Sequence, residues 1–87
     1  MQINTEYKLN EEVYLCFLEK DGLIRVTKVK IDEISIRDDG VFYYTKPWVG
    51  EDWEEYNLIP INNPELLIKR INELIVEEEE NERNRSS

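Results

Sequence analysis

The stretch Leu23–Arg37, with the sequence LIRVTKVKIDEISIR, carries the pattern from which the architecture of this chain is predicted. Its large apolar residues fall first on even-numbered positions (Ile24 and Val26) and then on odd-numbered positions (Val29 and Ile31). They return to even-numbered positions at Ile34 and Ile36. A straight strand does not exchange its buried face twice, because successive side chains point to opposite faces. We therefore predict one long strand with a bulge near Thr27-Lys28 and a bend near Asp32-Glu33. Strands that curve in this way are how small barrels close.

Hairpins are predicted on both sides of this strand. Lys20-Asp21-Gly22 precedes it and Asp38-Asp39-Gly40 follows it, and Asp-Gly is a strong signal for a tight turn. Upstream, Val13–Leu18 is apolar on both parities, which favours a strand buried on both faces. Downstream, Val41–Thr45 is the returning strand.

A loop, a short strand and a helix are expected to complete the chain. Residues 46–55 read as a loop, and Tyr56–Ile61 holds a short strand that Pro60 limits. Asn63 is suited to capping a helix whose first position is Pro64. The apolar face of this helix should cover the open end or edge of the barrel within one chain, and a two-fold dimer contact is the alternative. It comprises Leu67, Ile68, Ile71, Leu74 and Ile75.

The order β-β-β-loop-β-α predicts a mainly β fold with a C-terminal helix, arranged as a small curled barrel. We expect one domain over residues 1–80. Acidic residues are unfavourable at the C-terminal end of a helix, so fraying is expected at Val76–Glu80 and a disordered polar tail over residues 81–87. The predicted core consists of Val13, Leu15, Phe17, Ile24, Val26, Ile34, Ile36, Phe42, Ile71, Leu74 and Ile75.

The negative charge is concentrated in the second half of the chain. Residues 1–46 hold seven Lys/Arg against nine Asp/Glu, and residues 47–87 hold four against eleven, which gives −2 and −7 of a total of −9. Such a balance opposes binding to nucleic acid or to an anionic membrane and favours a basic protein surface as partner. The Glu77–Glu80 run could mimic phosphates, although a solubilising tail is the commoner role of such a run.

Catalytic and metal sites find little support in the sequence. There is no histidine, and Cys16 lies inside the most apolar run, where a thiol is usually structural. The paired carboxylates are sequence neighbours, which does not make them face one site. Asp38-Asp39-Gly40 lacks the ligand spacing of an EF-hand calcium loop. We therefore expect a protein that is not an enzyme and that needs no cofactor or metal.

The most suggestive segment for binding interleaves aromatic and acidic side chains. Tryptophan and tyrosine are frequent hot spots, and surrounding acids steer a complex towards a basic partner. The alternative role is structural, and we expect one tryptophan in the core and the other partly exposed. The predicted partner-binding residues are Trp48, Glu51, Asp52, Trp53, Glu54, Glu55 and Tyr56.

A second hypothesis is a module that binds a small ligand such as a nucleotide, acting as an oligomer because one small barrel has little room for a pocket. Cations interleaved with aromatics are how barrels bind nucleic-acid components. The opposing interpretation is that these cations balance neighbouring acids and protect an edge strand. The residues of this hypothesis are Arg25, Lys28 and Lys30 with Tyr43, Tyr44 or Trp48.

The chain resembles the small SH3-like barrel accessory proteins of Gram-positive bacteria and their phages. The resembling segments are Leu9–Tyr14, Val26–Ile31, Ile36–Tyr44 and Glu55–Leu58 before a C-terminal helix, within about residues 7–75. Phage proteins of this kind include inhibitors of host defence, so the resemblance implies a binding role. The Lys46–Glu55 loop is longer than in the shortest members.

The expected location is the cytoplasm. The segment Met1–Glu6 has neither the basic nor the apolar region of a signal peptide, and no apolar run approaches the ~20 residues of a membrane span. A single cysteine allows no internal disulfide, which fits a reducing compartment. The sequence thus favours a non-enzymatic interaction protein that binds a basic protein surface, without direct contact to nucleic acid or membrane.

Overall fold

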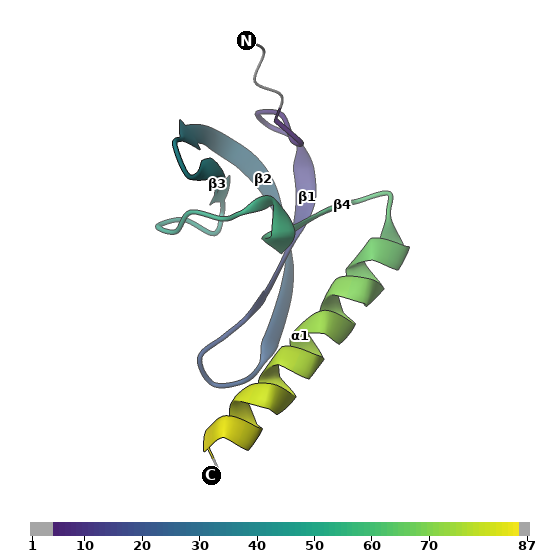
Figure 1. Cartoon of the computed structure of the whole chain (residues 1–87). Helices are drawn as coiled ribbons and strands as arrows, with labels where there is room; N and C mark the ends of the chain where they lie inside the picture. The colour runs from purple at the N-terminus through teal and green to yellow at the C-terminus, as the bar shows by residue number, and fades with distance from the viewer. Residues whose placement is uncertain (1–4, 86–87) are drawn as a thin grey trace.

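The computed structural model describes residues 5–85 (Figure 1). Four strands form one antiparallel sheet, and a helix packs on one of its faces. The elements in chain order are β1 (Glu12–Leu18), β2 (Ile24–Arg37), β3 (Gly40–Lys46), a 3₁₀ turn η1 (Glu55–Asn57), β4 (Leu58–Pro60) and α1 (Pro64–Arg85). The predicted mainly β fold with a C-terminal helix is therefore confirmed.

The sheet is curled but does not close into the expected barrel among the described residues. Its strand order is β3-β2-β1-β4, so β3 and β4 lie at opposite ends. The three-residue strand β4 pairs only with Val13–Leu15 of β1. The outer edge of β3 is instead met by the loop that follows it, where Tyr43 pairs with Trp53 through two backbone hydrogen bonds of 2.8 Å. This loop contact takes the place of a closing strand.

Both predicted hairpins are present. The turn between β1 and β2 contains Asp21 and Gly22, and Gly22 has a φ of +88°, which glycine adopts without the steric cost that a Cβ would bring. The turn between β2 and β3 consists of Asp38 and Asp39, and Gly40 begins β3. Local turn chemistry therefore determined both connections.

The irregularity in β2 occurs at one of the two predicted places. The register between β2 and β3 shifts between Ile31 and Glu33, as the expected bend at Asp32-Glu33 required. The bulge near Thr27-Lys28 is wrong, because β1 and β2 pair without interruption from Glu12↔Lys30 to Leu18↔Ile24. The first change of parity needs no bulge, because Ile24 packs with the cluster on one face of the sheet and Val29 and Ile31 belong to the cluster on the other.

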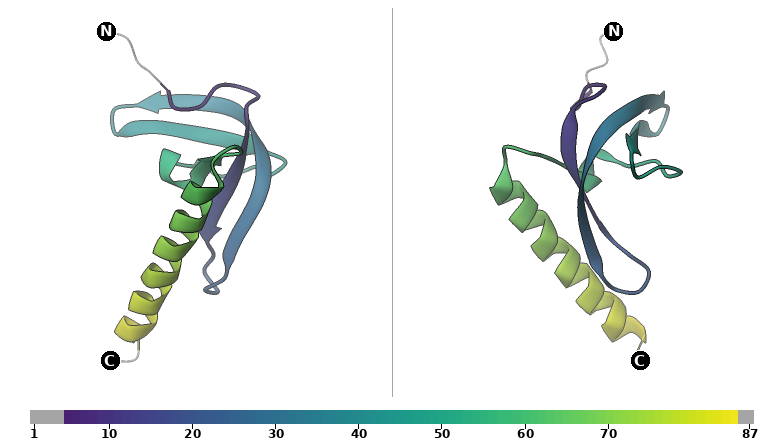
Figure 2. Two further views of the ribbon diagram at one scale, coloured as in Figure 1. Left: turned by 90° about the vertical axis from the view of Figure 1, so that its right-hand side faces the viewer. Right: turned by 180° about the vertical axis from the view of Figure 1, so that it is seen from behind.

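Strand β1 is the wall between two apolar clusters, as its unbroken apolar run predicted. One face contributes Val13, Leu15 and Phe17 to a cluster under the loop after β3. The other face contributes Cys16, with Tyr14 and Leu18 beside it, to a cluster under α1. Figure 2 shows the helix and the loop on opposite sides of the sheet.

Three residues of the predicted core are exposed: Val26, Ile36 and Ile75. Val26 and Ile36 lie on β2, and Ile75 follows the buried Leu74 on α1. Of the rest, Val13, Leu15 and Leu74 are buried, and Phe17, Ile24, Ile34, Phe42 and Ile71 are half-buried. The residues that complete the buried core are Tyr7, Cys16, Val29, Ile31, Tyr43, Thr45, Trp53, Leu58 and Ile59.

Helix α1 begins at Pro64, as predicted, and Asn63 Oδ1 accepts the backbone N–H of Leu66 at 3.2 Å in the manner of an N-cap. It packs on its own sheet through Leu74 with Leu66, Leu67 and Ile71. The expected fraying and tail are wrong as far as Arg85, because the helix continues to that residue; residues 86 and 87 lie outside the described part. Glu79 and Arg83 stand four positions apart in the order that stabilises a helix.

The helix is not a membrane span. Within the described residues, no helix combines the length and the apolar character that crossing a bilayer requires.

Candidate functional site

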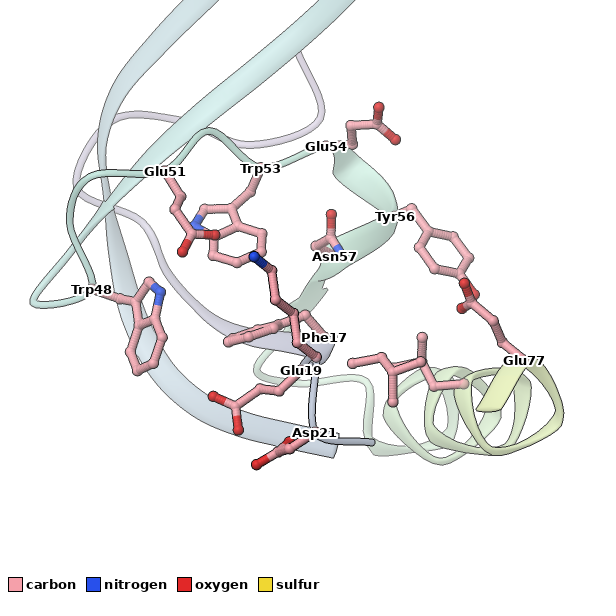
Figure 3. A pocket seen from close by; sticks show the side chains of 13 residues that line it. Phe17, Glu19, Asp21, Trp48, Glu51, Trp53, Glu54, Tyr56, Asn57 and Glu77 are labelled. Atoms are coloured by element: carbon pink, nitrogen blue, oxygen red, sulfur yellow. The ribbon is translucent and has the colours of Figure 1, made fainter. Parts of the chain in front are cut away.

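An open cleft lies where α1, the β1–β2 turn and the loop of residues 47–57 meet (Figure 3). Its volume is about 760 Å³, and ligand pockets commonly measure about 300–1,000 Å³. We name it the aromatic-acidic cleft because aromatic and acidic side chains make up most of its lining. Its aromatic residues are Phe17, Trp48, Trp53 and Tyr56, and its acidic residues are Glu19, Asp21, Glu51, Glu54 and Glu77.

The aromatic wall joins β1 to the loop after β3. The ring of Phe17 lies 4.7 Å from that of Trp53 and 5.4 Å from that of Trp48, measured between centroids. Trp53 is held by its backbone pairing with Tyr43. The buried Thr45 donates its hydroxyl to the carbonyl oxygen of Trp48 at 2.8 Å. Strand β3 therefore positions both tryptophans against Phe17.

The two tryptophans differ as predicted, with one in the core and the other partly exposed. Trp53 is only 6% exposed and belongs to the core cluster, whereas Trp48 is half-buried. The indole nitrogen of Trp53 has no hydrogen-bond partner among the described residues. Leaving a buried donor unpaired costs about 1–3 kcal/mol. Trp48 therefore offers ring surface to a ligand, and Trp53 offers an unused N–H.

The acidic rim of the cleft faces a single lining cation. Against its five carboxylates stands one lysine, Lys20. Glu19 is further neutralised by Arg25, whose Nε donates to it at 2.8 Å and whose guanidinium lies 5.0 Å from the ring centroid of Trp48. The remaining carboxylates give the surface beside the aromatic wall a negative electrostatic potential. Within residues 5–85, no group of three or more His, Cys, Asp or Glu side chains is arranged to hold a metal ion.

Two of the predicted partner-binding acids lie outside this cleft. Asp52 accepts a hydrogen bond from Arg37 at 3.0 Å on the outer side of β3. Glu55 accepts the hydroxyl of the buried Tyr43 at 3.1 Å. Both carboxylates therefore have partners within the chain, and each fixes the loop to the sheet. Of the seven predicted residues, the cleft gathers Trp48, Glu51, Trp53, Glu54 and Tyr56.

Tyr56 is fixed on the helix side of the cleft by a residue that sequence reasoning missed. The guanidinium of Arg70 lies 3.8 Å from the ring centroid of Tyr56, and the hydroxyl of Tyr56 donates to Glu73 at 3.3 Å. Arg70 is nearly covered, and its Nε and Nη1 have no hydrogen-bond partner among the described residues. The Tyr56 ring and the carboxylate of Glu73, which lies 3.9 Å from Nε, compensate its charge. Burial raises the pKa of Tyr56, and Glu73 raises it further.

Other lining residues also escaped prediction: Phe17, Leu18, Glu19, Lys20, Asp21, Asn57, Leu74 and Glu77. The β1–β2 turn was recognised only as a turn, and Phe17 and Leu74 only as core. Glu77 belonged to a charge run without an assigned neighbour. Their proximity depends on how the helix and the hairpin pack, for which the sequence carried no local signal.

The structure does not assemble the residues of the nucleotide hypothesis into one site. Tyr43 is fully buried, Arg25 is paired with Glu19, and Tyr44 accepts a hydrogen bond from Arg37 at 2.8 Å. Lys28 and Lys30 instead line a separate cleft of about 510 Å³. Its other lining residues are Glu12, Val29, Lys46 and Pro47.

Comparisons of the chain with protein-family models, with curated proteins and with solved structures found no match. The resemblance to SH3-like accessory proteins therefore remains a prediction. The geometry and charge of the aromatic-acidic cleft carry the functional inference.

Proposed function

We propose that this chain is a non-enzymatic binding protein that docks on a Lys/Arg-rich surface of a larger protein through its aromatic-acidic cleft. The observation that carries the proposal is the convergence of five carboxylates and four aromatic rings on one open cleft. Aromatic side chains supply contact area at low entropic cost, and surrounding carboxylates attract and orient a cationic partner. The flat side of an arginine or the stem of a lysine would pack on Trp48.

Charge supports the choice of partner. The net charge of −9 disfavours phosphate-rich ligands, and the second half of the chain supplies most of it. Helix α1 adds Glu77 to the rim, so loop and helix present the same sign to an approaching surface. A host-defence inhibitor of the SH3-like accessory type, acting in the cytoplasm, is the specific form of this proposal that the sequence favours.

The proposal is tested by titrating the full-length protein into a fluorescein-labelled nonapeptide of alternating lysine and valine. At ~50 mM salt we expect saturable binding, with quenching of Trp48 fluorescence. At ~0.5 M salt the Debye length falls to a few Å and the affinity should drop at least tenfold. The same peptide with glutamate in place of lysine is the negative control.

A pair of double variants separates the cleft from general charge. Glu51→Gln/Glu54→Gln removes two charges from the cleft, and Glu33→Gln/Glu65→Gln removes two exposed charges from other surfaces. Because each exposed ion pair contributes roughly 0.2–1 kcal/mol, loss of two pairs should weaken binding of the cleft variant about two- to thirtyfold. The control should stay within about twofold. Equal loss in both variants would show that net charge, and not this cleft, drives binding.

A second candidate function is nucleotide binding at a different cleft from the one that carries the first proposal. It is favoured by one observation: Lys28, Lys30 and Lys46 line a common cleft of about 510 Å³. Two of these lysines have carboxylate partners, Glu12 at 3.6 Å and Asp32 at 3.3 Å, which weakens the site. A thermal-shift screen with nucleoside mono-, di- and triphosphates tests it, since a bound ligand raises the melting temperature by mass action. No shift at ~5 mM nucleotide removes this candidate.

A further inference from the structure

The backbone of β1 exposes an unused hydrogen-bonding edge. In an antiparallel pair, alternate residues direct both backbone groups to the same neighbour. Glu19 N–H bonds to Leu23 at 2.8 Å, and Glu11 accepts from Ile31 N–H at 3.0 Å. Since the β1–β2 register between these pairs is unbroken, odd-numbered residues of β1 bond to β2. Even-numbered residues, Leu18 among them, therefore direct their N–H and C=O to the opposite edge.

Strand β4 covers only the first part of that edge. Its pairing with β1 ends at Leu15↔Leu58, and the chain before Leu58 forms the turn η1 instead of continuing as a strand. The side chain of Asn57 reaches the carbonyl oxygen of Cys16 at 3.4 Å in place of a backbone donor. Leu18 lies two residues further on, and no strand within residues 5–85 pairs with it on this side.

The open edge lies in the aromatic-acidic cleft. Five consecutive residues from Phe17 to Asp21 line the cleft, and their side chains belong to both sides of the sheet. Phe17 packs with the tryptophans, whereas Leu18 packs with the cluster under α1. Figure 3 shows Phe17 between the loop and the helix. The floor of the cleft is thus a strand edge, with the loop as one wall and the helix as the other.

A second unused donor stands on the loop wall. Trp53 is 94% buried (6% exposed), its indole nitrogen has no partner among the described residues, and it lines the cleft. In Figure 3 this nitrogen is on the side of the ring that faces Trp48 and Glu51. A donor in this place needs an acceptor from the ligand, and the backbone carbonyls of an extended peptide are such acceptors.

We infer that the cleft takes its basic partner segment as an added β-strand, hydrogen-bonded to the edge of β1 at Leu18. This inference rests on the proposed function and specifies the conformation of the bound segment. Successive side chains of such a strand point to opposite walls. They meet Glu51 and Glu54 on the loop wall and Glu77 on the helix wall, so cations at either parity find a carboxylate. Backbone bonds supply affinity that does not depend on the side chains.

A Lys/Arg-bearing strand fits this edge better than a second copy of the chain does. Two copies joined at Leu18 would bring two sets of cleft carboxylates together, and each chain carries a net charge of −9. Edge-to-edge pairing of identical strands is opposed by such like charges. Dimerisation through β1 is therefore an outcome that would overturn the inference.

The test uses three nonapeptides of alternating lysine and valine with the same charge. The first is unmodified, the second is N-methylated on every second residue, and the third is N-methylated on every residue. Residues of one parity direct their backbone groups to one edge of a strand, so the second peptide keeps one usable edge and the third keeps none. Binding to the full-length protein is followed by ¹⁵N NMR, which reads affinity and the Leu18 amide together.

An added strand predicts that the second peptide binds within about threefold of the first and the third at least tenfold more weakly. The Leu18 amide should shift and gain protection from exchange with the first two peptides, whereas the Phe17 amide, which is already bonded to β2, should gain no protection. Equal affinities for all three would overturn the inference and leave the proposed function intact. No binding of the unmodified peptide would overturn both the inference and the proposed function. A concentration-dependent dimer with the same Leu18 shift would also overturn the inference, because the strand added at Leu18 would then belong to a second copy of the chain.

Discussion

Tyr7 donates its hydroxyl to the carbonyl oxygen of Leu58 at 2.9 Å, across 51 positions of the chain. The bond is buried and fastens the segment before β1 to the start of β4. The ring of Tyr7 also lies edge-on to that of Tyr43, with centroids 5.6 Å apart. Tyr7 therefore belongs to the core cluster that also contains Trp53 of the cleft.

The first prediction concerns this bond. Tyr7→Phe keeps the ring and leaves the carbonyl of Leu58 without its buried donor, so the free energy of unfolding should fall by about 1–2 kcal/mol. Urea denaturation followed by tryptophan fluorescence measures it. Tyr14→Phe is the matched control, because Tyr14 is half-buried on the helix side of β1, and it should change stability by less than about 0.5 kcal/mol. Similar losses in both variants would refute the role given to Tyr7.

The second prediction is a loss of stability in strong alkali. Burial, together with Glu6, Glu11 and Glu55, raises the pKa of Tyr7 from 10.0 to about 12. Burial also raises the pKa of Tyr43.

The pKa of Tyr7 is raised in the folded state, which means that the folded protein holds this proton more tightly than the unfolded chain does. The resulting contribution to the free energy of unfolding is complete below pH 10. It is lost as the pH rises from about 10 to 12. Denaturation series at pH 8, 10 and 11.5 measure the fall, and Tyr7→Phe should make it shallower. A flat profile in the wild-type protein to pH 12 would contradict the assignment.

The third prediction compares two neighbouring residues of α1. Leu74 is 3% exposed and packs with Cys16 and Ile59, whereas Ile75 is 42% exposed. Leu74→Ala should cost about 2–4 kcal/mol through lost burial and a residual cavity. Ile75→Ala should change stability by less than about 1 kcal/mol. Thermal unfolding of the two variants decides the point, and the reverse order would mean that the helix presents its other face to the sheet.

The fourth prediction separates the two tryptophans of the cleft. Trp53→Ala should destabilise the fold by about 3–5 kcal/mol, because it empties a core position. Trp48→Ala should cost less stability and weaken binding of the lysine-valine peptide at least fivefold, since the half-buried ring is the one a ligand reaches. Denaturation and peptide titration of each folded variant give both values. If Trp48→Ala binds as the parent does, the aromatic part of the cleft is structural only.

The sequence predicted those features of the fold that depend on short-range chemistry. Asp21-Gly22 and Asp39-Gly40 mark the hairpins, Asn63-Pro64 marks the helix start, and the doubly apolar run from Val13 to Leu18 marks the central strand. In each case neighbouring residues carry the signal, through a positive φ, a fixed φ or an apolar run that has no alternation. The bend at Asp32-Glu33 is also a short-range feature, because the change in the positions of the apolar residues indicated it in the sequence.

Features that depend on long-range packing were missed or misplaced. Nothing near Tyr7 signals a hydrogen bond to Leu58, and nothing near Trp53 signals pairing with Tyr43. Parity assigned Val26 and Ile36 to the core, but the structure leaves them 40% and 53% exposed. The candidate cleft shows the same division: the sequence singled out its loop residues, whereas Glu19, Asp21 and Glu77 join them only through the folded arrangement.

The position of Cys16 makes the reactivity of its thiol a measure of the contact between α1 and the sheet. Its side chain is fully buried under α1, with Leu74 and Ile59, and burial raises the pKa of its thiol, which the nearby Arg70 partly offsets. A thiol reagent therefore reaches this atom when α1 leaves this face of the sheet, either alone or as part of the unfolding of the whole domain. The labelling rate of the unmodified protein, compared with the rate of global unfolding, thus tests whether α1 detaches on its own, and it does so without introducing any probe into the cleft.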